Sequence, residues 1–111
     1  MVTKKNDILQ GTLALLVLKT LASGKRMHGY AITAHIQRVS AQLLRVEEGS
    51  LYPALQRLLL QGWIVGEWSK TEENRRARYY KITSAGRKQL ERELSRYLRV
   101  SGAIARILQP V

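Results

Sequence analysis

The chain has 111 residues, which is enough for one domain with a modest hydrophobic core. Hydrophobic residues make up 45 %, which excludes an intrinsically disordered chain. Lys and Arg number 19 against 8 Asp and Glu, so the formal net charge is +11 and the sequence pI is near 10.6. Such an excess of positive charge favours a polyanionic partner, and nucleic acid is the first candidate.

The chain has no cysteine and no long apolar run, and both features bear on where the protein is located. Cysteine is absent, which excludes disulfides and thiolate chemistry and is compatible with a reducing compartment. The longest apolar run, Leu13 to Leu18, is broken by Lys19 and is far shorter than the roughly 20 residues of a membrane-spanning helix. No small-residue cleavage site follows this run, so we expect no signal peptide and no membrane partner. These features predict a cytoplasmic protein.

Two helices are predicted in the first part of the chain. The first is expected to be capped by Asp7 and to end at Ser23–Gly24. Its apolar residues are too numerous for one face, which predicts burial on two sides. The second helix is expected over Met27 to Val39. At its start, His28 has no second ligand at a spacing of three or four, so a structural or phosphate-contacting role is favoured over metal binding.

A third helix is predicted after Gly49. Ser50 is expected to cap it, and Pro53 to lie in its first turn, where a missing N–H is harmless. The core face is defined by spacings of four and three at Leu51, Leu55 and Leu58. The helical turn leaves the remaining side chains off that face, namely Tyr52, Pro53, Gln56, Arg57 and Leu60. Gly62 is the expected C-terminal stop.

A β-hairpin with a cationic loop is predicted next. Its strands are expected over Trp63 to Lys70 and Arg78 to Thr83, which are enriched in β-formers. In the loop, Asn74 is a turn former, and Arg75 and Arg76 lie at or near the tip. The hairpin as a whole carries more cationic than acidic residues.

Four aromatic residues belong to this hairpin. Tyr79 and Tyr80 are neighbours on one strand, so one of them must point inward. Trp63 and Trp68 are predicted to pack in the core and at the root of the hairpin, since tryptophan is usually buried.

A long final helix is predicted after Ser84, which is expected to cap it. Its apolar side chains follow spacings of four and three and form a stripe, made of Leu90, Leu94, Tyr97, Ile104 and Leu108. No later element covers this stripe, so the helix must pack on the body or on a second copy. Pairing it across a two-fold axis with the partner's first helix would also cover Leu9, Leu13 and Leu16. The arginines beside the stripe, Arg92, Arg96 and Arg99, are interpreted as a solvated face.

The order of elements predicts a mainly α fold with a small antiparallel β-hairpin, a winged helix-turn-helix with a C-terminal dimerisation helix. We expect the DNA-binding part over residues 1–83 and the dimerisation helix over residues 84–111, in one compact unit. The second and third helices form the helix-turn-helix, and the third would lie in the major groove. In a two-fold dimer the recognition helices would lie about 34 Å apart, which suits a roughly palindromic operator.

Six segments in order resemble the PadR family of bacterial transcriptional regulators. They are LQGTLALLVLKTLA (9–22), HGYAI (28–32), GSLYPALQRL (49–58), QGWI (61–64), RRARYYKIT (75–83) and AGRKQLE (85–91). The resemblance covers roughly Ile8 to Leu94, and GSLYPALQRL followed by QGWI is its most specific part. It implies a winged-helix homodimer, usually a repressor, whose terminal helix packs against the partner's N-terminal helix. The single terminal helix resembles the short subtype of the family.

The resemblance also implies DNA-binding residues. Ser50, Tyr52 and Pro53 match the start of the recognition helix, where family members approach bases and phosphates. His28, Gly29 and Tyr30 match a motif that faces the phosphate backbone. The wing motif is matched by Arg76, Arg78, Tyr79 and Tyr80. The chain departs from the family at Leu59, where a glutamate is common.

Two kinds of DNA contact are expected. Lys70, Arg75, Arg76 and Arg78 would pair with phosphates and supply sequence-independent affinity. Gln56 can form a paired hydrogen bond with adenine, and Arg57 with guanine, if either points into the groove. Ser50 can contact a base edge or a phosphate, and Tyr52 can equally be a hinge between core and surface.

Other functions are less well supported by the sequence. No Gly-rich phosphate loop, paired-carboxylate constellation, Cys nucleophile or Ser-His-Asp set indicates an enzyme, and no cofactor or metal is expected. The family resemblance implies an aromatic or drug-like effector at the dimer interface, where Tyr97 is the one aromatic residue of the terminal helix. An RNA-binding winged helix remains the alternative, since basic charge alone does not exclude it. In a third hypothesis the wing is a protein-interaction surface.

Overall fold

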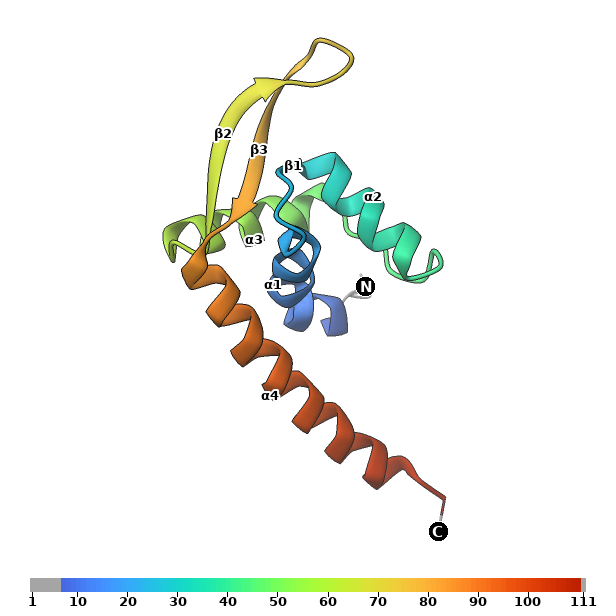
Figure 1. The fold of residues 1–111 in the computed structure, drawn as a ribbon. Coiled ribbons are helices and arrows are strands. Elements are labelled where there is room, and N and C mark those ends of the chain that lie inside the picture. The colour runs from blue at the N-terminus through green and yellow to red at the C-terminus, as the bar shows by residue number, and fades with distance from the viewer. Residues whose placement is uncertain (1–6, 111) are drawn as a thin grey trace.

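The computed structural model describes residues 7–110, with side chains from Thr12 onward (Figure 1). In chain order it has α1 (Asp7–Leu21), β1 (Met27–His28), α2 (Gly29–Val39), α3 (Glu48–Leu60), β2 (Ile64–Lys70), β3 (Arg76–Ile82) and α4 (Ser84–Leu108). The first three helices form a body from which the β2–β3 hairpin and α4 project at opposite ends. The predicted fold class, a mainly α winged helix with a small antiparallel β-hairpin, is confirmed. None of the helices within residues 7–110 has the length and hydropathy of a membrane span.

The core lies where α1, α2, α3 and the base of the hairpin meet. The predicted face of α3 is confirmed, because Leu51, Leu55 and Leu58 are all buried. On α1, Leu13 and Leu15 are both buried although a separation of two residues places them on opposite sides of a helix, which confirms burial on more than one side. Each such large apolar side chain contributes about 1.5–3 kcal/mol when it leaves water.

The sheet has three antiparallel strands in the order β1-β3-β2. Strand β1 was not predicted, because two residues carry no alternation pattern. Ile64 and Ile82 face each other at the base of the hairpin and are buried in the core. The turn places Asn74 at φ 64°, which confirms its predicted role. The β2–β3 hairpin is called the wing below.

The start of α3 differs from the sequence prediction. The helix begins at Glu48, and its N-cap is Glu47, whose side chain makes no capping bond within the described chain. Ser50 therefore lies inside the first turn and is not the cap. Pro53 falls in the second turn, where it has no N–H to donate to the carbonyl of Gly49. The N-cap therefore lies three residues earlier in the chain than the predicted cap, Ser50.

The start of α4 is set by Thr83 and not by Ser84. The Thr83 hydroxyl accepts a hydrogen bond from the N–H of Gly86 at 3.0 Å and donates to the carbonyl of Gly62 at 2.8 Å. This one side chain therefore fixes both the helix start and its attachment to the α3–β2 turn. Next to it, Arg87 donates to the carbonyl of Ala22 at 2.9 Å, which joins α4 to the end of α1.

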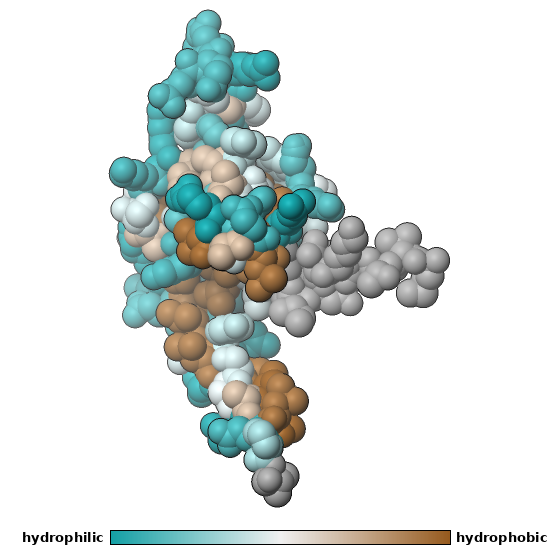
Figure 2. All heavy atoms as spheres, turned by 90° about the vertical axis from the view of Figure 1, so that its right-hand side faces the viewer, coloured by the Kyte–Doolittle hydropathy of each residue, from teal (hydrophilic) through white to brown (hydrophobic). Residues whose placement is uncertain are grey.

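The far part of α4 leaves the body and carries an exposed apolar surface. Figure 2 shows hydrophobic residues gathered along this part of the molecule, whereas the wing is hydrophilic. The exposed apolar side chains of α4 are Leu94, Tyr97, Leu98, Val100, Ile104, Ile107 and Leu108.

Candidate nucleic-acid interface

A groove of about 960 Å³ lies between the wing and helices α2 and α3. Helix α3 contributes Tyr52, Gln56 and Leu59 to its wall, and the wing contributes Trp68, Arg75, Arg76 and Arg78. Helix α2 and the strand before it supply His28, Tyr30, His35 and Arg38. The groove therefore combines a helix with polar side chains, a row of arginines and several aromatic rings.

The arginines of the groove are free to attract an external anion. Among the side chains of residues 12–110, the single ion pair joins Arg26 and Glu67, so Arg75, Arg76 and Arg78 have no carboxylate within pairing distance. Glu72 and Glu73 lie in the same loop but form no such pair among these residues. The unpaired positive charge makes the groove an attractive surface for a polyanion.

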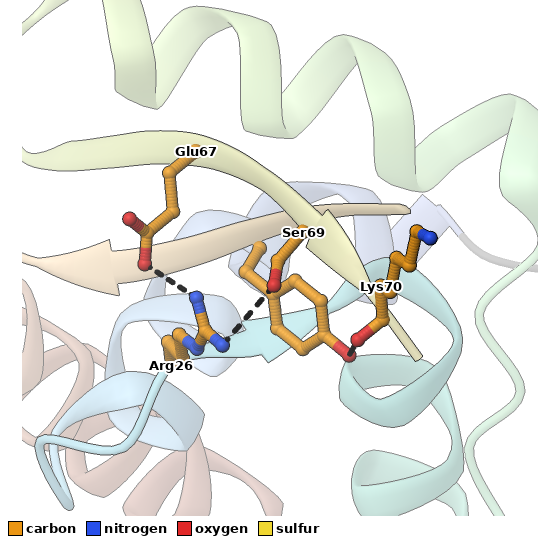
Figure 3. A network of polar contacts seen from close by, with 5 residues as sticks. Arg26, Glu67, Ser69 and Lys70 are labelled. Atoms are coloured by element: carbon orange, nitrogen blue, oxygen red, sulfur yellow. Dashed lines mark hydrogen bonds and ion pairs between the residues drawn. The ribbon is translucent and has the colours of Figure 1, made fainter. Parts of the chain in front are cut away.

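The outer face of the wing is tied to the body by Arg26, in the turn between α1 and β1 (Figure 3). Its guanidinium donates to Glu67 at 2.7 Å and to Ser69 at 3.3 Å, and it lies 4.6 Å from the ring centroid of Tyr79. The Tyr79 hydroxyl donates to the carbonyl of Lys70 at 3.4 Å. This brace restrains the angle of the wing. The sequence did not reveal it, because its partners lie about 40 residues away in the chain.

The inner face of the wing follows from the β2–β3 register. Gly66 lies opposite Tyr80, Trp68 opposite Arg78, and Lys70 opposite Arg76, so all six share one face. Tyr80 is the inward tyrosine of the pair, and its burial raises the pKa of its phenol.

The two tryptophans differ in environment. Trp63 packs partly buried against the core, as predicted. Trp68 is 58 % exposed, so the prediction that it packs at the root of the wing is wrong. The root is covered by the body, whereas Trp68 lies further along the strand, where its ring stacks under the Arg76 guanidinium at 4.8 Å.

Arg78 packs against Gly66 and Tyr80 on this face. Its guanidinium is 5.9 Å from the Tyr80 ring centroid, and a Cβ at Gly66 would lie only 2.6 Å from its Nε. Glycine at position 66 therefore makes room for the arginine. The Nε–H is buried and has no acceptor among the described residues. Burying a donor in this way is unfavourable unless another group accepts its hydrogen bond.

Only some of the DNA-binding residues predicted on α3 line the groove. Tyr52, Pro53, Gln56 and Arg57 are exposed, and Ser50 is half-buried. Gln56 and Tyr52 line the groove, whereas Ser50, Pro53 and Arg57 are not among its lining residues. On the wing, Lys70 is exposed but likewise outside the lining.

Tyr52 and Gly29 connect α3 to α2. A Cβ at Gly29 would lie 2.7 Å from the Tyr52 hydroxyl oxygen, so the phenol lies directly against this glycine. The Tyr52 side chain is nevertheless 47 % exposed. It therefore packs between the helices and presents one side to the groove, which combines both roles considered for it.

His28 has a structural role. Its Nδ1 accepts a hydrogen bond from the N–H of Ala31 at 3.1 Å, which caps α2, and its ring lies edge-on to Tyr79 at 5.2 Å. Within the described part of the chain, no three His, Asp or Glu side chains are placed to hold a metal ion. Tyr30, the first residue of the helix after Gly29, is largely exposed at the rim of the groove.

The residues expected at a dimer interface fall into three groups. Leu13 is buried in the core of the single chain, and Leu16 and Leu90 pack partly against that core. Leu94, Tyr97, Ile104 and Leu108 are exposed on α4. The side chain of Leu9 lies outside the residues whose side chains are described. The exposed group is the part of the set that needs a partner to be covered.

Comparison with known proteins agrees with this architecture. A 37.1 kDa protein of transposon TN4556 from Streptomyces fradiae is 43 % identical over 90 residues, and this chain spans 24 % of its length. A transcriptional regulator from Clostridium thermocellum superposes with a TM-score of 0.84 at 25 % identity, over 93 % of this chain and 99 % of that chain. The fold is also that of Bacillus subtilis PadR, solved in complex with operator DNA, with a TM-score of 0.66 at 24 % identity over 75 % of this chain and 47 % of that chain.

The comparison with protein families covers most of the chain. Residues 17–92 match the transcriptional regulator PadR-like family. This range includes β1, α2, α3 and the complete wing, and it ends within α4. The family consists of transcriptional regulators and not of enzymes. The chain belongs to the PadR-like family of transcriptional regulators.

Proposed function

We propose that this chain is a homodimeric repressor that binds double-stranded DNA at a specific sequence. The observation that carries the proposal is the groove, in which Gln56 of α3 faces the unpaired arginines of the wing. A helix of this kind fits the major groove, and a basic wing fits the adjoining phosphates. The B. subtilis relative solved with operator DNA supports the same use of the fold.

We assign affinity for DNA and sequence specificity to different residues. Arg75, Arg76 and Arg78 are proposed to bind phosphates, together with the exposed Lys70 at the edge of the wing. Arg78 is proposed to use the terminal N–H groups of its guanidinium for this, because its Nε–H is buried. Gln56 is the residue we assign to base readout, since its amide can pair with adenine.

Dimerisation is proposed through the exposed side of α4. Ile107 and Leu108 are 80 % and 76 % exposed in the single chain, and they continue the apolar surface formed by Ile104 and Tyr97. A contiguous apolar surface of this kind on a monomer marks an interaction site. A second copy related by a two-fold axis would cover it and would place two α3 helices about 34 Å apart. Sedimentation of the wild type and of Ile104→Glu tests this, with a dimer expected only for the wild type.

Release from DNA is proposed to follow binding of a small aromatic or drug-like effector at that dimer interface, where Tyr97 offers an aromatic surface. A shift in the α4 pairing would change the distance between the two recognition helices. A panel of aromatic compounds added to the protein–DNA complex tests this step, and a compound that dissociates the complex is the expected result. A cytoplasmic location is proposed as well, since the chain belongs to a family of transcriptional regulators.

DNA binding is tested by titrating labelled duplexes over a range of salt concentrations. Arg75→Ala/Arg76→Ala should weaken binding to all sequences, and the salt slope should fall by about 1.8 for two lost phosphate contacts. Lys81→Ala is the matched control, because Lys81 is an exposed cation on β3 that lies on the opposite face of the wing. Equal losses from the control and the double variant would contradict the proposed face.

Specificity requires a separate variant and a competitor. Gln56→Ala should change the preference among duplexes by about 1–3 kcal/mol at one base pair. Equal losses on specific and random DNA would contradict base readout by Gln56. RNA hairpins are expected to compete poorly with the labelled duplex. Efficient competition by RNA would favour the alternative of an RNA-binding winged helix.

A further inference from the structure

We infer that Trp68 is a positioning residue of the wing, whose indole holds the Arg76 guanidinium ready to bind a phosphate of DNA. The inference rests on the proposed function and adds to it a residue without an assigned role. An exposed tryptophan on a hydrophilic wing requires an explanation, because tryptophan is usually buried. Its exposed fraction of 58 % shows that core packing does not provide one.

The wing register brings the two side chains together. Trp68 lies opposite Arg78, and Arg76 lies opposite Lys70, so Trp68 and Arg76 are diagonal neighbours on the inner face. The Arg76 guanidinium carbon lies 4.8 Å from the centroid of the Trp68 ring, which is within cation–π range. Both residues line the groove, so the stacked pair is placed on its wall.

This stacking matters because a free arginine has many rotamers, and ordering it opposes binding. A guanidinium that lies over an aromatic face keeps its N–H groups available for a phosphate, since the stack uses its face and not its edge. Arg76 forms no ion pair within the described residues, so its charge is not neutralised in the free protein. The indole therefore restricts the side chain without occupying its donors.

The neighbouring arginine is positioned by different means. Arg78 lies over Gly66 and beside the Tyr80 ring, on the floor of the groove. Arg76 stands further out, next to the turn of the wing, and the Trp68 ring is the group that orders it. Two arginines of one strand are thus oriented by two aromatic residues of the same face.

A double-mutant cycle on the full chain tests the inference. Trp68→Ala should weaken binding of a labelled duplex at low salt by about two- to fivefold, the size of an exposed cation–π contact. In the Arg76→Ala background, the same substitution should have no effect. Trp68→Phe should retain part of the affinity, because a phenyl face also attracts the guanidinium. Thermal unfolding should be unchanged for all these variants, since both side chains are exposed.

Each contrary outcome identifies a different error. If Trp68→Ala binds as tightly as the wild type, or loses the same affinity with and without Arg76, the positioning role is refuted. A wild type that binds no duplex at low salt refutes the proposed function as well, so the two failures are distinguishable.

Fluorescence gives an independent measurement, because the chain has two tryptophans. Trp63→Phe leaves Trp68 as the one indole, and its emission should change when duplex DNA is added. In Trp63→Phe/Arg76→Ala, the change should be smaller at saturating DNA. Emission that does not respond to saturating duplex would overturn the inference.

Discussion

Gly86 is expected to be the residue of α4 that tolerates an added methyl group least. It is buried in the first turn of the helix, and a Cβ at this position would overlap the carbonyl oxygen of Trp63 and lie 2.8 Å from Cγ1 of Ile82. The Trp63 carbonyl also accepts the N–H of Thr83 at 3.0 Å, so it cannot move away without losing a hydrogen bond. Gly86→Ala must therefore push the start of α4 away from the base of the wing.

The magnitude follows from these two effects. Overpacking of a tight contact costs about 1–3 kcal/mol, and a weakened hydrogen bond adds about 1 kcal/mol. We expect the free energy of unfolding to fall by about 2–4 kcal/mol, and Tm by on the order of 10–20 °C for a chain of this size. Urea unfolding followed by circular dichroism at fixed protein concentration measures the change.

Gly102→Ala in the same helix is the matched control. The nearest atom to its added Cβ is Nη1 of Arg106 at 3.9 Å, an ordinary contact with the end of a flexible side chain. Alanine is a better helix former than glycine, so this variant should be more stable by about 0.5–1 kcal/mol. If Gly86→Ala unfolds at the same urea concentration as the wild type, the close packing of α4 on the wing is refuted.

Three further predictions follow from individual contacts. Thr83→Ala should lower stability by about 1 kcal/mol, because its hydroxyl caps α4, whereas Ser50→Ala should change urea unfolding much less. Burial raises the pKa of the Tyr80 phenol, so the folded state keeps this proton when the unfolded state begins to lose it near pH 10. Stability should therefore fall as pH rises above 10, and Tyr80→Phe should reduce that slope. Arg26→Gln should weaken DNA binding, because it removes a positive charge and leaves the Glu67 carboxylate unpaired on the wing. Glu67→Gln removes no positive charge and should not weaken binding. Equal effects of the two variants on DNA affinity in a salt titration would contradict this prediction.

The sequence predicted those parts of the fold that depend on periodic burial. The spacing of Leu51, Leu55 and Leu58 identified the core face of α3, because a helix turns by a fixed angle per residue. Alternation along β3 required one inward tyrosine, but only the tertiary packing decided that it is Tyr80. Strand β1 was missed because its pairing with β3 is a long-range contact that two residues cannot encode.

The site was predicted less completely than the fold. The motif resemblance indicated Gln56, Arg76 and Arg78, and the structure places all three in one groove. The exposure of Trp68 could not be foreseen, because average burial says nothing about a strand that projects beyond its core. The brace formed by Arg26 was also hidden, since it joins residues far apart in the chain.

The central claim is that a dimer of this chain reads duplex DNA with two recognition helices, one from each copy. Selection of bound duplexes from a random pool tests this claim most directly. The selection uses the full chain at moderate salt and then sequences the bound DNA. We predict enrichment of two inverted half-sites whose centres lie about one helical turn apart. A pool that remains random after repeated rounds, or one enriched in a single unpaired motif, would contradict the claim.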